Sequence, residues 1–373
     1  MIYLDYSANT PAAPGVLERF CEVERSCPGN ANSRHQAGRE AKRVIDHATQ
    51  NIAGLLGAQS AEVIYTSGAS EANNFALKGL AKLSRHAGRH IISTPLEHSS
   101  VSGTLTALQE QGYEIDLVDI RRDGTIDLGH LKELLRPDTI AVAVTLVDSE
   151  LGVVQPVKEI SELLQAWPNC HLHVDATQAV GKIPVSFEGV DTMSLTAHKF
   201  YGLNGIGLLL KRRKLALEPL IHGGESTTIY RSGTPTVALA ASLETAAVGE
   251  LPARTARVKE ANAFLRDALS KYPKVHINSP ENAIPHILNL SVENVKGTVF
   301  QRELDAEGVC VSVKSACSSD GLPSKAVFAV SRDRRNALSS WRISISHLTT
   351  DAEIDGFLQA FDTCYKTLTN KEN

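Results

Sequence analysis

Short apolar segments with the composition of β-strands alternate with helix-like segments through the first two thirds of the chain. In the segment 157–167, for example, apolar residues recur at intervals of three and four, which is typical of a helix. The strands are nearly continuous runs of Val, Ile and Leu, as in strands buried on both faces. The pattern therefore predicts an α/β fold with a mostly parallel central sheet covered by helices on both sides. The predicted strands are residues 63–66, 90–94, 114–119, 139–147, 171–175, 192–195 and 206–210, and the predicted helices are residues 70–83, 99–111, 128–135 and 157–167.

The last third of the chain mixes helices and strands in a different order, which indicates a smaller α+β domain. We predict a large α/β domain of residues 13–250 and a small domain made of residues 1–12 plus 251–373. The elements expected here are a helix at 253–272, strands at 286–292 and 309–313 with a helix between them, a strand at 341–346 and a final helix at 351–365.

Composition and charge exclude several classes of protein. Of the 373 residues, 42% are hydrophobic, and the net charge of −4 argues against a protein that coats nucleic acid or anionic membranes. No apolar run approaches the roughly 18 residues of a membrane span, and the first residues carry no secretory signal. The six cysteines are scattered without a C-x-x-C pair, so we expect a reduced, cytoplasmic protein.

Ligands of a doubly wound sheet bind at the carboxyl ends of the strands, so the residues that follow each strand are candidates for a site. After the strand 63–66, the small residues Ser67, Gly68, Ala69 and Ser70 open a helix. A helix N-terminus offers free N–H groups, and this one would hold a phosphate with Ser70 as a hydroxyl donor. On this segment alone, an ordinary helix cap at Ser67 or Ser70 is the better interpretation.

Asp175 ends the predicted strand 171–175, and Gln178 follows it closely. A carboxylate at this position can bond a ligand nitrogen or a metal. His171 and His173 share a strand face with Asp175, but no further strong ligand lies nearby in the sequence, and we expect no metal. An aspartate that caps the next helix is the alternative interpretation.

Two further candidates follow strand ends. Lys199 lies in the turn 196–199 rather than on a charged helix face. A partly desolvated lysine there would have a lowered pKa and could form a Schiff base, whereas the alternative is a solvated surface lysine. His98 could cover a planar cofactor or act as an acid–base group, or it could simply begin a helix.

Cys317 follows the predicted strand 309–313 within a run of small and polar residues at 315–321. The composition predicts an exposed loop, and nearby Lys314 favours the thiolate, so Cys317 is a candidate nucleophile. A surface thiol without function is the alternative. The other cysteines lie among apolar or helical neighbours and are expected to be inert.

Taken together, these segments resemble the cysteine desulfurases, which are pyridoxal-phosphate enzymes of the class V aminotransferase group with fold type I. The resemblance covers nearly the whole chain, and the ordered set of motifs makes it specific. SACSS at residues 315–319 is similar to the active-cysteine signature of the group I, NifS/IscS-like branch. The other motifs are YLDYSANTP at 3–11, GNANS at 29–33 with His35, TSGASEANN at 66–74, EH at 97–98, GVVQ at 152–155, HVDATQAVGK at 173–182, AHKFYG at 197–202 and RSGT at 231–234.

The resemblance implies a role for each candidate around the cofactor. Lys199 would hold pyridoxal phosphate as a Schiff base, and Asp175 would pair with the protonated pyridine nitrogen. Gln178 would bond the phenolic oxygen. His98 would stack on the ring and relay protons.

The resemblance also implies a phosphate site and a second subunit. Ala69, Ser70, Thr196 and His198 would hold the phosphate of the cofactor. Thr234 would reach the phosphate of the neighbouring subunit, which implies a homodimer.

The implied reaction converts L-cysteine to L-alanine. Arg342 would clamp the substrate carboxylate, a task suited to a guanidinium group, and Asn30 and Asp148 would lie on the substrate side. The Cys317 thiolate would attack the substrate sulfur and carry a persulfide. The sulfur would then pass to an acceptor protein, for iron–sulfur clusters or thiolation.

The chain departs from the family pattern mainly on the substrate side and keeps the cofactor positions. Asp148 stands where the family usually has asparagine, Lys314 where it has glycine, and residues 225–230 differ from the usual run. His347 replaces an arginine, Asn9 replaces a threonine, and the tail after the last helix is short. Two alternatives therefore stay open: a selenocysteine or cystine lyase or another class V enzyme, and a sulfur-relay subunit that needs a partner for activity.

Overall fold

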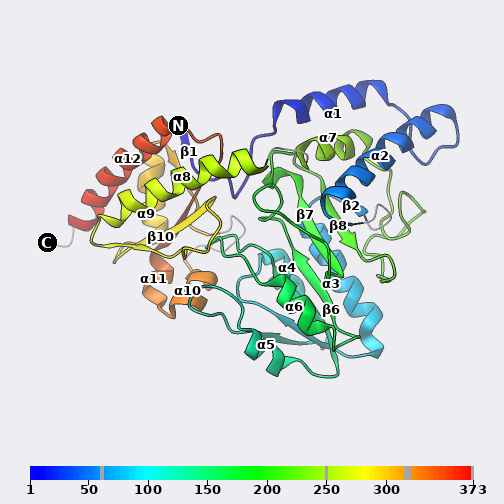
Figure 1. Cartoon of the computed structure of the whole chain (residues 1–373), viewed down its shortest axis with the longest axis horizontal. Coiled ribbons are helices and arrows are strands. Elements are labelled where there is room, and N and C mark those ends of the chain that lie inside the picture. Colours follow the sequence, from blue (N-terminus) through cyan, green and yellow to red (C-terminus); the bar gives the residue numbers. More distant parts are fainter. Residues whose placement is uncertain (59–62, 248–250, 315–320, 371–373) are drawn as a thin grey trace.

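A computed structural model describes residues 1–58, 63–247, 251–314 and 321–370. Its largest element is a seven-stranded sheet with the order β2-β8-β7-β6-β5-β3-β4, and Figure 1 shows it with helices packed around it. Strands β7, β6, β5, β3 and β4 run parallel, whereas β8 is antiparallel to both β2 and β7. The predicted α/β class with a mostly parallel sheet is thereby confirmed. The strands are β2 (Val63–Thr66), β3 (His90–Ser93), β4 (Glu114–Leu117), β5 (Thr139–Thr145), β6 (His171–Asp175), β7 (Thr192–Thr196) and β8 (Gly207–Lys211).

The two faces of this sheet are covered by different helices. Every residue of β5 is buried. Ala141 and Ala143 pack with α3 (Ala69–Leu83) and α4 (Ser99–Gln109), whereas Val142 and Val144 belong to the larger core that includes α6 (Val157–Leu164). Successive side chains of a strand point to opposite faces, so one strand contributes to both cores. The short helices α5 (Leu128–Leu134), η2 (Ser84–His86) and η3 (Ala197–Lys199) complete the connections.

Three helices form a group beside the sheet that the sequence patterns did not predict. They are α1 (Pro14–Ser26), α2 (Gln36–Leu55) and α7 (Val237–Ala247), and Figure 1 shows them together at the upper right. The alanine-rich α7 is buried between the other two: Ala240 packs with α2, and Ala238 and Ala241 pack with Val23 of α1.

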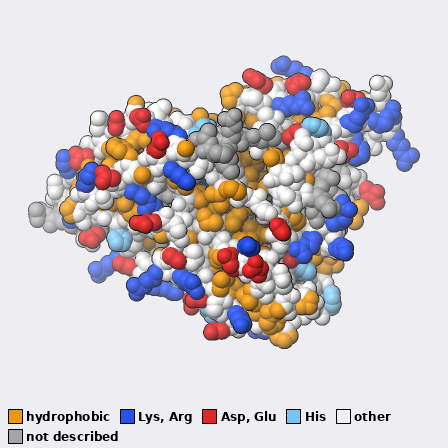
Figure 2. All heavy atoms as spheres, viewed as in Figure 1, with side chains coloured by type: hydrophobic (Ala, Val, Ile, Leu, Met, Phe, Trp, Pro, Cys, Tyr) orange, Lys and Arg blue, Asp and Glu red, His pale blue; other side chains and the backbone are white. Residues whose placement is uncertain are grey.

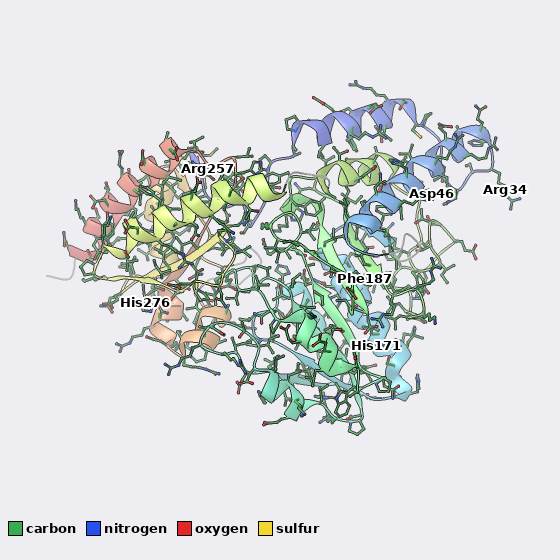
Figure 3. The ribbon with its side chains drawn as sticks, in the orientation of Figure 1. Arg34, Asp46, His171, Phe187, Arg257 and His276 are labelled. Carbon is green, nitrogen blue, oxygen red and sulfur yellow. The ribbon has the colours of Figure 1, made fainter. Side chains whose placement is uncertain are left out.

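The C-terminal third forms a second sheet, with the order β12-β10-β9 and antiparallel pairs. Trp341 of β12 stacks on Phe300, and Leu4 from the chain start joins the same core. Arg257 of α8, labelled in Figure 3, donates to Asp351 of α12 at 2.5 Å. The elements are β9 (Val275–Ile277), β10 (Ile287–Val292), β12 (Ser340–Ser344), α8 (Leu251–Ser270), α9 (Gly297–Ala306) and α12 (Asp351–Thr369).

The first residues of the chain pair with this second part. The strand β1 (Ile2–Tyr3) runs parallel to β11 (Val309–Cys310), which is shorter than the strand predicted at 309–313 because its partner is only two residues long. The helices α10 (Lys325–Ser331) and α11 (Arg334–Ser339) contribute apolar side chains to the core of the large sheet. The domain division near residue 250 stays a prediction.

Two further observations concern surface charge and membrane-spanning helices. Figure 2 shows side chains of both charge signs interspersed over much of the visible face. In the part of the chain that the structure describes, no helix is both long enough and apolar enough to cross a bilayer.

Candidate active site

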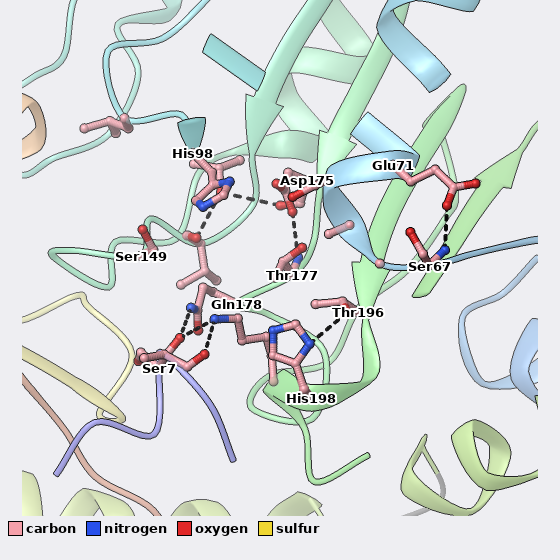
Figure 4. Close-up of a pocket in the computed structure, with 18 of the residues that line it drawn as sticks. Ser7, Ser67, Glu71, His98, Ser149, Asp175, Thr177, Gln178, Thr196 and His198 are labelled. Atoms are coloured by element: carbon pink, nitrogen blue, oxygen red, sulfur yellow. Dashed lines mark hydrogen bonds between the residues drawn. The ribbon is translucent and has the colours of Figure 1, made fainter. Parts of the chain in front are cut away.

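A cavity of about 360 Å³ lies at the carboxyl ends of β5, β6 and β7, where Thr145, Asp175 and Thr196 end their strands (Figure 4). Ser7 from the chain start also lines it. This is the position at which doubly wound sheets bind ligands. The cavity brings together nine of the residues that the sequence singled out: Ala69, Ser70, His98, Asp175, Gln178, Thr196, His198, Lys199 and Arg342.

The N-terminus of α3 forms one wall of the cavity. Its N-cap is Gly68, and no side chain caps it, so the interpretation as an ordinary cap at Ser67 or Ser70 is wrong. The first N–H groups of the helix have no acceptor within the helix and lie at the positive end of its dipole. Gly207 of β8 packs against this turn: a Cβ there would lie 2.6 Å from Gly68 Cα. The turn therefore has the character of an anion-binding site.

The carboxylate of Asp175 is fixed by two donors. Asn73 Nδ2 donates to its Oδ2 at 2.8 Å, and the backbone N–H of Thr177 donates to its Oδ1 at 2.9 Å. Asn73 Oδ1 in turn faces His173 Nε2 at 3.0 Å. The sequence did not single out Asn73 for this role; the signal was a polar residue on the buried face of the helix 69–83. Asp175 is thus a rigid, buried acceptor at the edge of the cavity.

Lys199 ends η3 and reaches back to the start of the chain. Its Nζ donates to the carbonyl oxygens of Ser7 at 2.8 Å and Ala8 at 2.6 Å. Gln178 Nε2 also donates to the Ser7 oxygen at 2.8 Å, as Figure 4 shows. The backbone at residues 7–8 therefore holds both side chains at the cavity. Lys199 is thus not the solvated surface lysine of the alternative interpretation.

Two histidines at the cavity are neutral at physiological pH. Burial lowers the pKa of His98, with Lys199 adding to the effect, although Asp175 opposes it. The backbone N–H of Ser100 donates to His98 Nδ1 at 3.1 Å, so the ring proton lies on Nε2. Burial and the nearby lysines lower the pKa of His198 to about 4. The neutral His98 ring therefore presents an N–H donor at Nε2.

The hydroxyl of Thr196 fixes the ring of His198. It donates to the Ile206 carbonyl oxygen at 3.1 Å, so at 3.1 Å it accepts from His198 Nδ1. Because this leaves Nε2 of the neutral ring without a proton, the ring carries a defined tautomer.

Arg342 of β12 enters the cavity from the second sheet. It is 1% exposed, and its Nη2 donates to Asp5 Oδ1 at 2.9 Å while its Nη1 donates to the Ser149 carbonyl oxygen at 2.6 Å. Its Nε has no partner among the described residues. A guanidinium group held in this way has a donor left for a carboxylate.

Four predicted residues do not line this cavity. Thr234 lies in a separate hollow that shares Ser67 with it. Asn30 accepts from the Asn32 N–H at 2.9 Å in the turn that precedes α2. Asp148 is buried between the lining residues Val147 and Ser149. Cys317 lies outside the described residues. The roles of these four stay predictions.

His171, His173 and Asp175 share a strand but do not converge on a common centre: His173 and Asp175 both bond to Asn73, whereas His171 faces Asp191. His171, labelled in Figure 3, lies 3.7 Å from the carboxylate of Asp191. His173 is buried beside Thr192 and Asn73, and burial lowers its pKa to about 4. In the described ranges, no group of three or more His, Cys, Asp or Glu side chains is placed to hold a metal.

Comparison with known proteins identifies the family. The aminotransferase class-V model matches residues 2–357. The cysteine desulfurase IscS of Proteus mirabilis is 40% identical over 366 residues, which cover 95% of this chain and 90% of that protein. The chain belongs to the aminotransferase class-V family and, within it, to the relatives of the NifS- and IscS-type cysteine desulfurases. This family depends on pyridoxal phosphate.

Solved structures agree with this assignment. A NifS-like protein superposes with a TM-score of 0.91 at 32% identity and covers 99% of both chains. A structure described as SspA in complex with cysteine superposes with a TM-score of 0.82 at 30% identity. The superposition covers 94% of this chain and 100% of that chain. The fold is therefore that of the NifS-like pyridoxal-phosphate enzymes, fold type I.

Proposed function

We propose that this protein is a pyridoxal-phosphate-dependent cysteine desulfurase that converts L-cysteine to L-alanine and passes the sulfur to an acceptor. The observation that carries the proposal is the cavity in which Lys199, Asp175 and the uncapped N-terminus of α3 meet. The curated relatives named cysteine desulfurase support the same reaction rather than a selenocysteine or cystine lyase.

The residues around the cavity fit pyridoxal phosphate. The first turn of α3, with Ser70, Thr196 and His198, suits a phosphate group, and Asp175 suits a protonated ring nitrogen. Two buried hydroxyl groups that line the cavity, Ser7 Oγ and Thr177 Oγ1, have no partner in the described part of the chain and are available to a ligand. When bound, the cofactor supplies an electron-withdrawing ring that stabilises negative charge on the substrate's α-carbon.

Lys199 and His98 are the proton carriers that we assign to this reaction. The Lys199 amine, held near the Ser7 and Ala8 oxygens, can accept a proton once it is released from the cofactor. His98 is neutral and carries its proton on Nε2, the nitrogen that faces away from Ser100, so it can donate a proton there.

Cys317 and Arg342 would carry out the sulfur step. Arg342 binds the substrate carboxylate through its remaining donors. The Cys317 thiolate then attacks the substrate sulfur: an S–S bond forms and the carbon–sulfur bond breaks. The electron pair left on carbon takes a proton, which yields alanine and a persulfide on Cys317. This step rests on the SACSS resemblance, since residue 317 lies outside the described residues.

Three further parts of the proposal concern partners and location. The resemblance of RSGT at 231–234 to the family motif supports a homodimer in which Thr234 of each copy reaches the phosphate site of the other. Persulfide sulfur needs an acceptor protein. Because the Cys317 thiol must stay free, we place the protein in the cytoplasm, where thiols are kept reduced.

The test is an assay of alanine and sulfide released from L-cysteine with a reductant. Wild-type protein should release both, and Lys199→Ala should lose cofactor absorbance and activity together. Cys317→Ser should keep the yellow colour of bound cofactor and lose at least about a hundredfold in sulfide release, the scale expected on removal of a nucleophile. Cysteine left unchanged while selenocysteine or cystine is consumed would contradict the proposal.

A further inference from the structure

A buried lysine lies directly behind the cavity. Lys182 is 6% exposed, and its Nζ donates to Gln178 Oε1 at 2.7 Å. A buried ammonium group usually faces a carboxylate, but here its partner is an amide oxygen. The charged groups that act on Lys182 are Lys199 and Arg342, and both are cationic. The charge of Lys182 in turn lowers the pKa values of His198 and His286. These surroundings destabilise an ammonium group, so the folding free energy does not account for a lysine at this position.

The bond to Lys182 decides which way the Gln178 amide faces. A carboxamide accepts at its oxygen and donates at its nitrogen, whereas an ammonium group only donates. The oxygen of Gln178 must therefore face Lys182, and its NH₂ must face away. One N–H of that group binds the Ser7 oxygen, which also accepts from Lys199. The other N–H has no acceptor within the described ranges of the chain and remains as a donor, and Gln178 lines the cavity.

We propose that Lys182 is a positioning residue, which fixes the Gln178 carboxamide so that its NH₂ donates to an oxygen of the bound cofactor. The proposal rests on the proposed function, because it assumes that the cavity holds pyridoxal phosphate. Burial and the two cationic neighbours lower the pKa of Lys182 to about 7. An anionic cofactor offsets those neighbours and keeps Lys182 in its ammonium form.

The experiment compares cofactor binding by the wild type, Lys182→Met, Gln178→Ala and the double variant, each freed of cofactor and titrated with pyridoxal phosphate. Lys182→Met should weaken binding about three- to tenfold, the value of one hydrogen bond, and should shift the absorbance maximum of the bound cofactor. The double variant should match Gln178→Ala, because Lys182 acts through Gln178. Lys182→Arg, which keeps a donor-only cation, should retain most of the affinity.

The control is Lys158→Met, which removes a lysine whose side chain is 86% exposed on α6 and should match the wild type. If Lys182→Met bound pyridoxal phosphate with the affinity and absorbance spectrum of the wild type, the positioning role would be overturned. It would also be overturned if Lys182→Met weakened cofactor binding as much in the Gln178→Ala protein as in the wild type. Failure of Lys182→Met to fold without cofactor would also overturn it, since the lysine would then be required by the fold. If the wild type itself bound no pyridoxal phosphate, the proposed function would fail instead.

Discussion

The carboxyl group of Asp148 is buried beside the cavity with one oxygen unsatisfied. Its Oδ2 accepts from the backbone N–H groups of Glu150 and Leu151, whereas its Oδ1 has no partner among the described residues. Burial, reinforced by the charge of Glu150, raises its pKa to about 7. Burial also raises the pKa of the Glu97 carboxyl to about 8, and the charges of Asp175 and Asp148 add to the effect. The folded protein therefore holds protons that the unfolded chain loses.

Substitution of Asp148 by asparagine should change how stability depends on pH. Folding raises the pKa of Asp148 from 3.8 to about 7, so the unfolded chain loses this proton at a lower pH than the folded protein does. The free energy of unfolding therefore falls progressively as pH rises through that window. Asparagine cannot ionise and keeps an oxygen for the same two N–H groups. At about 1.4 kcal/mol per pKa unit, Asp148→Asn should raise the free energy of unfolding by at most roughly 4 kcal/mol at pH 8 and change it little at pH 4.

Urea unfolding of both proteins at pH 4 and pH 8 measures this difference. A free-energy gap between them that is the same at the two pH values would show that folding does not raise the pKa of Asp148.

At the residue scale, the sequence predicted the side chains at the strand ends but not their supports. Lys199 and His98 follow predicted strands and Asp175 ends one, so the topology alone brings them to one edge of the sheet. Asn73 reaches Asp175 across 102 positions of the sequence, and no local pattern marks such a contact. Lys182 ends the HVDATQAVGK segment, and no local pattern predicts a role for it, because its burial depends on the tertiary fold.

Gly207 of β8 closely approaches the turn before α3, which is the proposed phosphate site. A Cβ at Gly207 would lie 2.6 Å from Gly68 Cα and 2.6 Å from the Leu195 carbonyl oxygen. Backbone atoms cannot swing aside as a side chain does. The position of the turn therefore depends on a glycine in the neighbouring antiparallel strand.

Gly207→Ala should accordingly separate β8 from this turn. We expect a loss of about 1–3 kcal/mol in the free energy of unfolding, the usual cost of overpacking, together with weaker binding of pyridoxal phosphate. The matched control is Gly103→Ala in α4, where a Cβ would meet no atom within 4 Å and where alanine should stabilise by up to about 1 kcal/mol. Thermal unfolding and cofactor titration check both variants, and equal behaviour of the two would refute the packing argument.

At the element scale, periodicity predicted the buried strands well and the peripheral helices poorly. The strands β2 and β6 have the predicted bounds. By contrast, α1 buries only Val16 and Val23 of its 13 residues, so its sequence carries few of the regularly spaced apolar positions that predict a helix. The alanine-rich α7 has almost no polar face, and β9 is too short at three residues to show a period.

At the scale of the whole molecule, the cavity is assembled from three parts of the chain. Ser7 comes from the first residues, Asp175 and Lys199 from the seven-stranded sheet, and Arg342 from the second sheet. The ion pair of the buried Arg342 with the half-buried Asp5 ties the second sheet to the chain start. The sequence predicted the mostly parallel α/β sheet and most of the lining residues, whereas the geometry between the three parts depends on packing that no local pattern encodes. The cysteine loop is assigned by resemblance alone.

Mass spectrometry of the protein after brief exposure to L-cysteine tests the central claim most directly. The account predicts one additional sulfur atom, a gain of about 32 Da, on the peptide that contains Cys317, which reductant removes. The same gain should be absent from Cys317→Ser and from Lys199→Ala. Alanine production with no added sulfur on Cys317, or added sulfur on another cysteine that survives in Cys317→Ser, would contradict the account.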